Sequence, residues 1–172
     1  NLVFVFANTG LEKMETLQFV ARCDYEFGLG VIYIEANINP ELGKGTGYVV
    51  HSSINTLKTV GDKYGPFEQM ILKYGLPNQK FPHCTRELKT VPIYKYGKDF
   101  FGSRDFYQAI GIRIDEIDRM SIHRKEKKLI YPLISLVPTT NENIDAFWKE
   151  QSFDLGLKSY EGNCSLCWKK DF

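Results

Sequence analysis

Long apolar runs are missing from this sequence of 172 residues. A membrane-spanning helix needs about 18 to 20 uninterrupted apolar residues, and no stretch approaches that length. The first residues also lack the charged segment and cleavage site of a secretory signal peptide. An excess of one charge is absent too, because 22 Lys and Arg balance 21 Asp and Glu to a net charge of +1. These absences argue against a polycation or a disordered tail, and we expect a soluble cytoplasmic protein without a membrane partner.

Cysteine is scarce as well, with four residues in the whole sequence. Four are too few to build a disulfide-stapled domain of this size, so their spacing is better interpreted as chemistry. Apolar residues make up 43% and aromatic residues 14% of the chain, enough for a substantial core. Because one core usually serves roughly 100 to 200 residues, we expect a single domain over residues 1–172.

The first 36 residues predict a strand, a helix and a second strand. The apolar run at residues 2–7 is typical of a strand buried on both faces. A helix is predicted from about residue 11 to residue 27, opened by a capping box of Thr9 and Glu12. A second strand is predicted at residues 31–36. In such a βαβ unit the functional loops lie at the carboxyl ends of the strands, which predicts a ligand edge at residues 8–10.

One face of this first helix should carry its apolar side chains at helical spacing, namely Met14, Leu17, Ala21 and Tyr25. Further elements are expected as a strand at 48–50, a helix at 66–74, a helical stretch that residues 81–89 lead into, a strand at 106–113 and a helix at 141–149. The basic run at 123–128 is interpreted as a solvated loop, with a nucleic-acid or phosphate role as the alternative. His51 and His123 have no partner pattern and are expected at the surface.

Three cysteines form the first candidate site. Cys164 and Cys167 make a Cys-x-x-Cys pair, and Cys84 directly follows His83. Three thiolates with one imidazole would satisfy a tetrahedral zinc site, whereas three thiolates alone would suit an iron–sulfur cluster. The alternative is a set of unrelated thiols. Cys23 falls on the predicted first helix and is interpreted as a small core residue.

A second candidate site surrounds the end of the strand at 106–113. Arg113 and Arg119 could converge on phosphate or sulfate through bidentate hydrogen bonds. The alternative is salt bridging of these arginines with Asp115 and Glu116. Further positive charge at this edge could come from Arg86, Lys89 and Arg104.

Four motifs in order resemble the phosphoadenosine phosphosulfate (PAPS) reductase family, and in particular its phage and mobile-element members. The motifs are Phe6-Ala7-Asn8-Thr9-Gly10-Leu11-Glu12 followed by Glu15-Thr16-Leu17, then Cys84-Thr85-Arg86-Glu87-Leu88-Lys89, then Gly111-Ile112-Arg113 with Glu116 and Arg119, and finally Gly162-Asn163-Cys164 and Cys167 with Lys169-Lys170. The resemblance covers nearly the whole chain. It implies an adenine nucleotide alpha hydrolase-like fold of the PP-loop type, an α/β architecture with a twisted, mostly parallel sheet and helices on both faces.

The resemblance also implies site residues. Asn8, Thr9 and Gly10 would line a nucleotide pocket for ATP, PAPS or adenylylsulfate. The residues expected to hold phosphate or sulfate are Lys89, Arg113, Glu116 and Arg119. Adenylylsulfate reductases of this family bind a [4Fe–4S] cluster through a Cys-Cys pair and a later Cys-x-x-Cys. Here His83-Cys84 replaces the Cys-Cys, and 79 residues lie between Cys84 and Cys164. The segment at about 155–172 is therefore expected to fold back on Cys84.

Two departures from the family pattern bear on the activity. The first strand of the family and its Ser-Gly-Gly phosphate loop are missing, and with Asn1 in place of a methionine we expect truncation. The C-terminal Glu-Cys-Gly nucleophile of thioredoxin-dependent members is also missing, so no residue is assigned to release of sulfite.

Two functions from different classes follow from these observations. The first is an enzyme of sulfonucleotide reduction, or of adenylation-dependent sulfur transfer to a nucleic acid, a protein or a small molecule, with an iron–sulfur or zinc site. The alternative is a non-catalytic binding or assembly module stabilised by zinc, which could form a homo-oligomer. A third and plainer interpretation is a soluble α/β domain with incidental cysteines.

Overall fold

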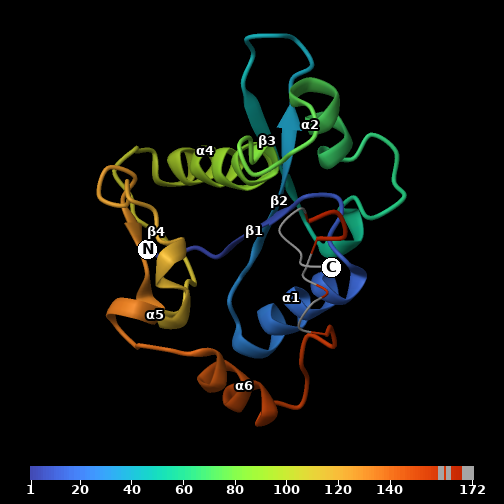
Figure 1. Ribbon diagram of the computed structural model, residues 1–172. Helices are drawn as coiled ribbons and strands as arrows, with labels where there is room; N and C mark the ends of the chain where they lie inside the picture. The colour runs from blue at the N-terminus through green and yellow to red at the C-terminus, as the bar shows by residue number, and fades with distance from the viewer. Residues whose placement is uncertain (159–160, 162–163, 168–172) are drawn as a thin grey trace. The chain divides into compact units, whose positions relative to one another are not determined.

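The computed structural model describes residues 1–158, 161 and 164–167 (Figure 1). The chain divides into two compact units, and each is described by itself. The first unit comprises Asn1–Asp99 with the described part of Leu155–Phe172, and the second comprises Phe100–Asp154. Four residues of the resemblance, Gly162, Asn163, Lys169 and Lys170, lie outside the described part of the chain.

The first unit contains a three-stranded mixed sheet in the order β1-β2-β3. Strand β1 (Val5–Asn8) pairs in parallel with β2 (Ile32–Ile38), as predicted for a βαβ unit. Strand β3 (Thr46–His51) pairs antiparallel with β2. The α/β class is therefore confirmed, and the parallel arrangement holds for β1 and β2, whereas β3 makes the sheet mixed.

Helix α1 (Met14–Phe27) crosses between β1 and β2 and ends as predicted at Gly28, which takes a left-handed φ of 59°. Its predicted start is wrong. The N-cap is Lys13, which makes no side-chain cap hydrogen bond. Thr9 and Glu12 do interact, but Glu12 forms an isolated β-bridge with Cys164 before the helix begins. The β-bridge at Glu12 and the extended backbone of Lys13 keep Glu12 outside the helix, so it cannot serve as the third helical position.

The predicted apolar face of α1 is wrong at both ends. Met14 and Tyr25 are 49% and 82% exposed, whereas Leu17 is 1% exposed. Leu17 packs with Tyr33 of β2 and with Leu57, which follows the short 3-10 helix η1 (Ile54–Thr56). The buried face therefore centres on Leu17 and is narrower than the sequence spacing indicated.

Helix α2 (Pro66–Tyr74) begins and ends as predicted, because Pro66 fits the first helical turn and Gly75 follows the last residue. The buried side of α2 faces strand β2 and a helical segment downstream. The core cluster that these elements form consists of Ala36, Ile38, Phe67, Met70 and Leu88. Each fully buried aliphatic side chain of this kind contributes about 1.5 to 3 kcal/mol through removal of apolar surface from water.

A continuous helical segment follows in three parts. A short α3 (His83–Thr85) leads into η2 (Arg86–Thr90), a π-helical turn, and then into α4 (Val91–Phe101). The helical stretch that residues 81–89 were predicted to lead into is present, and it begins already at His83. A π-turn is rare and is frequently found at functional sites.

The second unit has short elements and its own small sheet. The elements are β4 (Gln108–Ala109), η3 (Ile114–Arg119), β5 (Leu129–Ile130), α5 (Pro132–Ser135) and α6 (Asn141–Lys149). Strand β4 pairs with β5 in parallel. The strand predicted at 106–113 is therefore present only as the two residues of β4. Helix α6 lies where it was predicted and opens with a capping box of Thr140 and Asn143.

Within the described residues, no helix combines the length and the apolar character needed to cross a bilayer.

Candidate functional site

The carboxyl end of β1 carries a buried polar residue with a fixed side chain. Asn8 is fully buried, and its Nδ2 donates to Oε1 of Glu35 at 2.6 Å and to the carbonyl of Lys58 at 2.7 Å. The backbone N–H of Lys58 donates to the same Glu35 oxygen at 2.6 Å. Asn8 is therefore positioned by β2 and by the segment that follows η1. Its Oδ1 is buried and has no hydrogen-bond partner among the described residues.

The other carboxylate oxygen of Glu35 faces strand β3. Nε2 of His51 lies 3.3 Å from Oε2 of Glu35, and the two side chains are 15% and 8% exposed. Nδ1 of His51 lies 3.2 Å from the hydroxyl of Thr56. The expectation that His51 lies free at the surface is wrong, because the β2–β3 pairing turns it toward Glu35. His123, by contrast, is exposed as expected.

Gly10 follows in the turn after β1, with a φ of 81°. A Cβ atom at this position would approach Cδ of Pro66 to 2.9 Å. Glycine is required on both counts, because a positive φ strains other residues and the first residue of α2 leaves no room for a side chain. The turn therefore lies directly against the start of α2.

Thr9 and Glu12 together join the turn to two other parts of the chain. The Thr9 hydroxyl donates to Oε1 of Glu12 at 3.2 Å and lies 3.9 Å from Sγ of Cys164. Nζ of Lys89 lies 3.5 Å from the same Glu12 oxygen. The carboxyl end of β1, the π-turn and the C-terminal segment thus meet at one place.

Glu12 is a buried carboxylate with one oxygen that the described residues leave unsatisfied. Its side chain is 2% exposed, and Oε2 has no hydrogen-bond partner among the described residues. Buried carboxylate oxygens usually receive hydrogen bonds, because a carboxylate loses its hydration when it is buried. A donor from a ligand would satisfy this oxygen.

Cys164 is held beside Glu12 by backbone pairing. The bridge between Glu12 and Cys164 is accompanied by a hydrogen bond of 2.9 Å from the N–H of Ser165 to the carbonyl of Leu11. Burial raises the pKa of the Cys164 thiol, and the Glu12 carboxylate raises it further. The thiol is therefore protonated at neutral pH in this arrangement.

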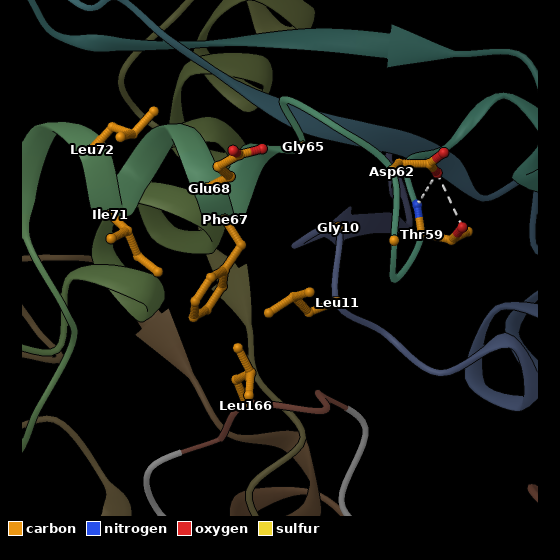
Figure 2. Close-up of a pocket in the computed structure, with 11 residues that line it drawn as sticks. Gly10, Leu11, Thr59, Asp62, Gly65, Phe67, Glu68, Ile71, Leu72 and Leu166 are labelled. Atoms are coloured by element: carbon orange, nitrogen blue, oxygen red, sulfur yellow. Dashed lines mark hydrogen bonds between the residues drawn. The ribbon is translucent and has the colours of Figure 1, made fainter.

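A cavity of about 230 Å³ opens beside the turn after β1 (Figure 2). Figure 2 shows Leu11, Phe67 and Leu166 directed toward one another, so apolar side chains from the β1 turn, α2 and the C-terminal segment form one wall. The remaining lining residues are Gly10, Thr59, Gly61, Asp62, Gly65, Glu68, Ile71 and Leu72.

The polar part of the cavity lining belongs to a tight turn. Oδ2 of Asp62 accepts hydrogen bonds from the backbone N–H of Thr59 at 2.7 Å and from its hydroxyl at 3.0 Å. These two bonds, chiefly the one from the backbone, hold the pKa of Asp62 below its usual range. The cavity thus combines an apolar wall with an ionised carboxylate.

The predicted metal ligands are only partly brought together. Cys84 and Cys164 pack against the same core cluster around Met70 and Leu88. The ring of His83 is stacked on Tyr74 and Phe81, with ring centroids 5.6 and 5.9 Å away. Among the described residues, no group of three His, Cys, Asp or Glu side chains could hold a metal ion. Cys84, Cys164, Cys167 and His83 are therefore not gathered as one ligand set among the described residues, and we derive no reaction step through a metal or cluster.

The predicted phosphate-binding arginines lie in the second unit and are engaged with carboxylates. Nε and Nη2 of Arg113 donate to the two carboxylate oxygens of Asp115 at 3.0 and 3.3 Å. Glu116 pairs with both Arg113 and Arg119. This geometry matches the salt-bridge alternative. An anion at this position would have to compete with Asp115 and Glu116.

Sequence reasoning missed the two buried carboxylates of the first unit. Glu12 was interpreted as a capping residue, and Glu35 was passed over within its strand. The signal for Glu35 was present, since a single carboxylate within the apolar run at 31–36 needs buried partners. The cavity turn of Thr59 and Asp62 left no comparable signal in the sequence.

Comparison with known proteins gives one relative and no fold assignment. No protein-family model matches the chain, and no solved structure matches it. Over 167 residues, 97% of the chain, the sequence is 38% identical to the uncharacterized nin region protein ORF290 of Escherichia phage lambda. The chain spans 56% of the length of that relative. It is therefore similar to a phage protein, as the resemblance to phage members led us to expect.

Proposed function

We propose that the chain binds an adenine nucleotide or a sulfonucleotide at the carboxyl end of β1 and is a PAPS reductase-like enzyme. The observation that carries this proposal is the meeting of Thr9, Lys89 and Cys164 around Glu12, next to the cavity that Gly10 lines. The reaction class is sulfonucleotide reduction or adenylation-dependent sulfur transfer, and it follows from the resemblance of the motifs.

The residues offer complementary contacts for such a ligand. The side chain of Lys89 is 46% exposed and supplies a cation at the edge of the site. Oε2 of Glu12 and Oδ1 of Asn8 have no hydrogen-bond partner among the described residues and are acceptors for amino or hydroxyl donors. The apolar wall of the cavity offers a surface for a base. These features support binding, and the electron or sulfur transfer is left without an assigned residue.

Titration calorimetry of the protein with ATP, PAPS and adenylylsulfate tests the proposal. We expect at least one to bind, and we expect Lys89→Gln to weaken binding by about 10- to 100-fold, the loss of one charge-assisted contact. The matched control is Lys98→Gln, which removes the same charge from an exposed position of α4 and should leave the affinity unchanged. Failure of all three nucleotides to bind the wild-type protein would overturn the proposal.

A non-catalytic binding module is the second candidate. The specific observation in its favour is the fastening of the C-terminal segment to the β1 turn, through the Glu12–Cys164 bridge and the shared core contact of Cys84 and Cys164. Metal analysis with melting curves separates the two candidates. Stoichiometric zinc, a fall in Tm on chelation and no nucleotide binding would favour the module.

A further inference from the structure

The basic loop between η3 and β5 has a defined shape within the second unit. Here it is called the basic loop and comprises Ser121–Lys128. The N–H of Arg124 donates to the carbonyl of Ser121 at 3.2 Å, and the N–H of Lys127 donates to that of His123 at 3.0 Å. These successive turns fix the course of the backbone, so the side chains project from a preformed scaffold.

The basic loop is also anchored at both ends. The N–H of Ser121 donates at 3.1 Å to the hydroxyl of Tyr131, a side chain that is 5% exposed. At the other end, Nζ of Lys128 pairs with the carboxylate of Asp105. The two anchors therefore fix the ends of the loop, and its middle residues are exposed to solvent.

The basic loop carries three exposed cationic side chains. Arg124, Lys125 and Lys127 are exposed, and none of them forms an ion pair within the part of the chain that the structure describes. The one carboxylate in the loop, Glu126, is instead directed to His123, with its Oε2 3.2 Å from Nδ1. The positive charge of the loop is thus left uncompensated, in a chain whose net charge is only +1.

An apolar side chain lies next to these cations. Ile122 is 86% exposed, and residues 122–126 line a hollow of about 250 Å³. An isoleucine so exposed gains nothing from the fold, because burial is what makes apolar side chains stabilising. Its position at the start of the cationic stretch makes it available to the same partner.

We propose that the basic loop binds the phosphodiester backbone of a nucleic acid, through Arg124, Lys125 and Lys127, with Ile122 against a sugar or base edge. Closely spaced cations are better matched to a repeating anion than to a single phosphate. Apolar side chains beside such cations are used as wedges between bases. The proposal is independent of nucleotide binding at the β1 edge. It goes beyond that function by naming a surface for a macromolecular partner.

A membrane surface is the less favoured partner. Interfacial binding requires a broad apolar face together with positive charge, and a single isoleucine on the loop does not supply one. Vesicle binding is therefore an outcome of the test rather than part of the proposal.

Fluorescence anisotropy with a 30-base-pair duplex, the matching single strand and an RNA of that sequence tests the proposal. We expect wild-type protein to bind at least one. The triple variant Arg124→Gln, Lys125→Gln, Lys127→Gln should lower the slope of log affinity against log salt by about 2.7 on a duplex, or about 2.1 on a single strand. Lys63→Gln, Lys80→Gln, Lys98→Gln removes equal charge from exposed sites of the first unit, and its slope should stay near wild type.

A second variant separates the apolar contact from the charges. Ile122→Ser should weaken binding while leaving the salt slope unchanged, and an unchanged affinity would overturn the role of Ile122. Equal losses in the two triple variants would overturn the proposal. So would absence of nucleic-acid binding at 50 mM salt, or dependence on these three cations only for phosphatidylserine vesicles. Every substituted side chain is exposed, so circular dichroism should show the wild-type fold.

Discussion

The turn after β1 and the start of α2 touch at Gly10 and Pro66, where a Cβ atom on Gly10 would come within 2.9 Å of the proline Cδ. Gly10 also takes a φ of 81°, so a side chain here would meet both a strained backbone and a rigid ring. Contact between this turn and α2 sets one wall of the cavity that both elements line.

Substitution of Gly10 by alanine should therefore lower the free energy of unfolding by about 2 to 4 kcal/mol, from the left-handed backbone and the clash together. Gly43→Ala is the matched control, because Gly43 has a φ of 79° and nothing within 4 Å of an added Cβ. It should cost only about 1 kcal/mol from the backbone. Urea unfolding measures both, and equal losses would show that the Pro66 contact does not matter.

The buried pair of Asn8 and Glu35 leads to a second prediction. Nδ2 of Asn8 donates to a carboxylate and to a carbonyl. Asn8→Asp would replace this donor by a carboxylate oxygen, which would then face both of these acceptors. We expect a loss of about 3 to 5 kcal/mol in the free energy of unfolding, the usual cost of an uncompensated buried charge.

The control for this variant is Asn39→Asp. Asn39 is exposed, and its Oδ1 accepts a hydrogen bond from the N–H of Glu41, which an aspartate can also accept. Its stability should change by less than about 0.5 kcal/mol. A small effect at Asn8 in the same denaturation experiment would contradict the role assigned to its amide.

Local signals explain why part of the fold could be predicted. The apolar runs at 2–7 and 31–36, the helix stop at Gly28 and the proline at the start of α2 act over a few residues, and the structure contains the elements they predict. The antiparallel pairing of β3 depends on contacts across the sheet. Strand direction has no local signal in the sequence, and the expectation of a mostly parallel sheet came from the family resemblance.

The candidate site divides in the same way. Asn8 and Gly10 could be located because they end a strand, and the structure places them at the carboxyl end of β1. The partners of Glu12 could not be derived, because Lys89 and Cys164 come from positions 77 and 152 residues later in the chain. Only the resemblance linked these motifs before the structure was known.

Glu87 leads to a prediction about pH. Its side chain is 8% exposed, its Oε1 accepts from Nε of Arg86 at 2.6 Å, and its other oxygen accepts from the hydroxyl of Thr46 on β3. Burial alone would raise the pKa of Glu87, but the hydrogen bonds from Thr46 and Arg86 outweigh it and lower the pKa. The carboxylate therefore stabilises the fold above the unfolded-state pKa of about 4.3, and this contribution is lost as the pH falls through the lower folded-state pKa.

Glu87→Gln should accordingly reduce the free energy of unfolding by about 1 to 3 kcal/mol at pH 7, with the difference from wild type shrinking below about pH 4. Urea unfolding at a series of pH values measures this. Glu41→Gln, at an exposed position, is the control and should follow the wild-type curve. A difference at Glu87 that is constant with pH would mean that its charge is not what stabilises the β3 contact.

The last prediction concerns the thiol of Cys164. Burial raises its pKa, and the nearby Glu12 carboxylate raises it further, so alkylation by iodoacetamide should be slow at neutral pH and should accelerate as the pH rises. Glu12→Gln removes one of these causes and should make alkylation of Cys164 faster at the same pH, whereas Glu15→Gln at an exposed position of α1 should not. Mass spectrometry of the Cys164 peptide gives the rates. Equal rates in all three proteins would mean that the Glu12 carboxylate does not act on this thiol.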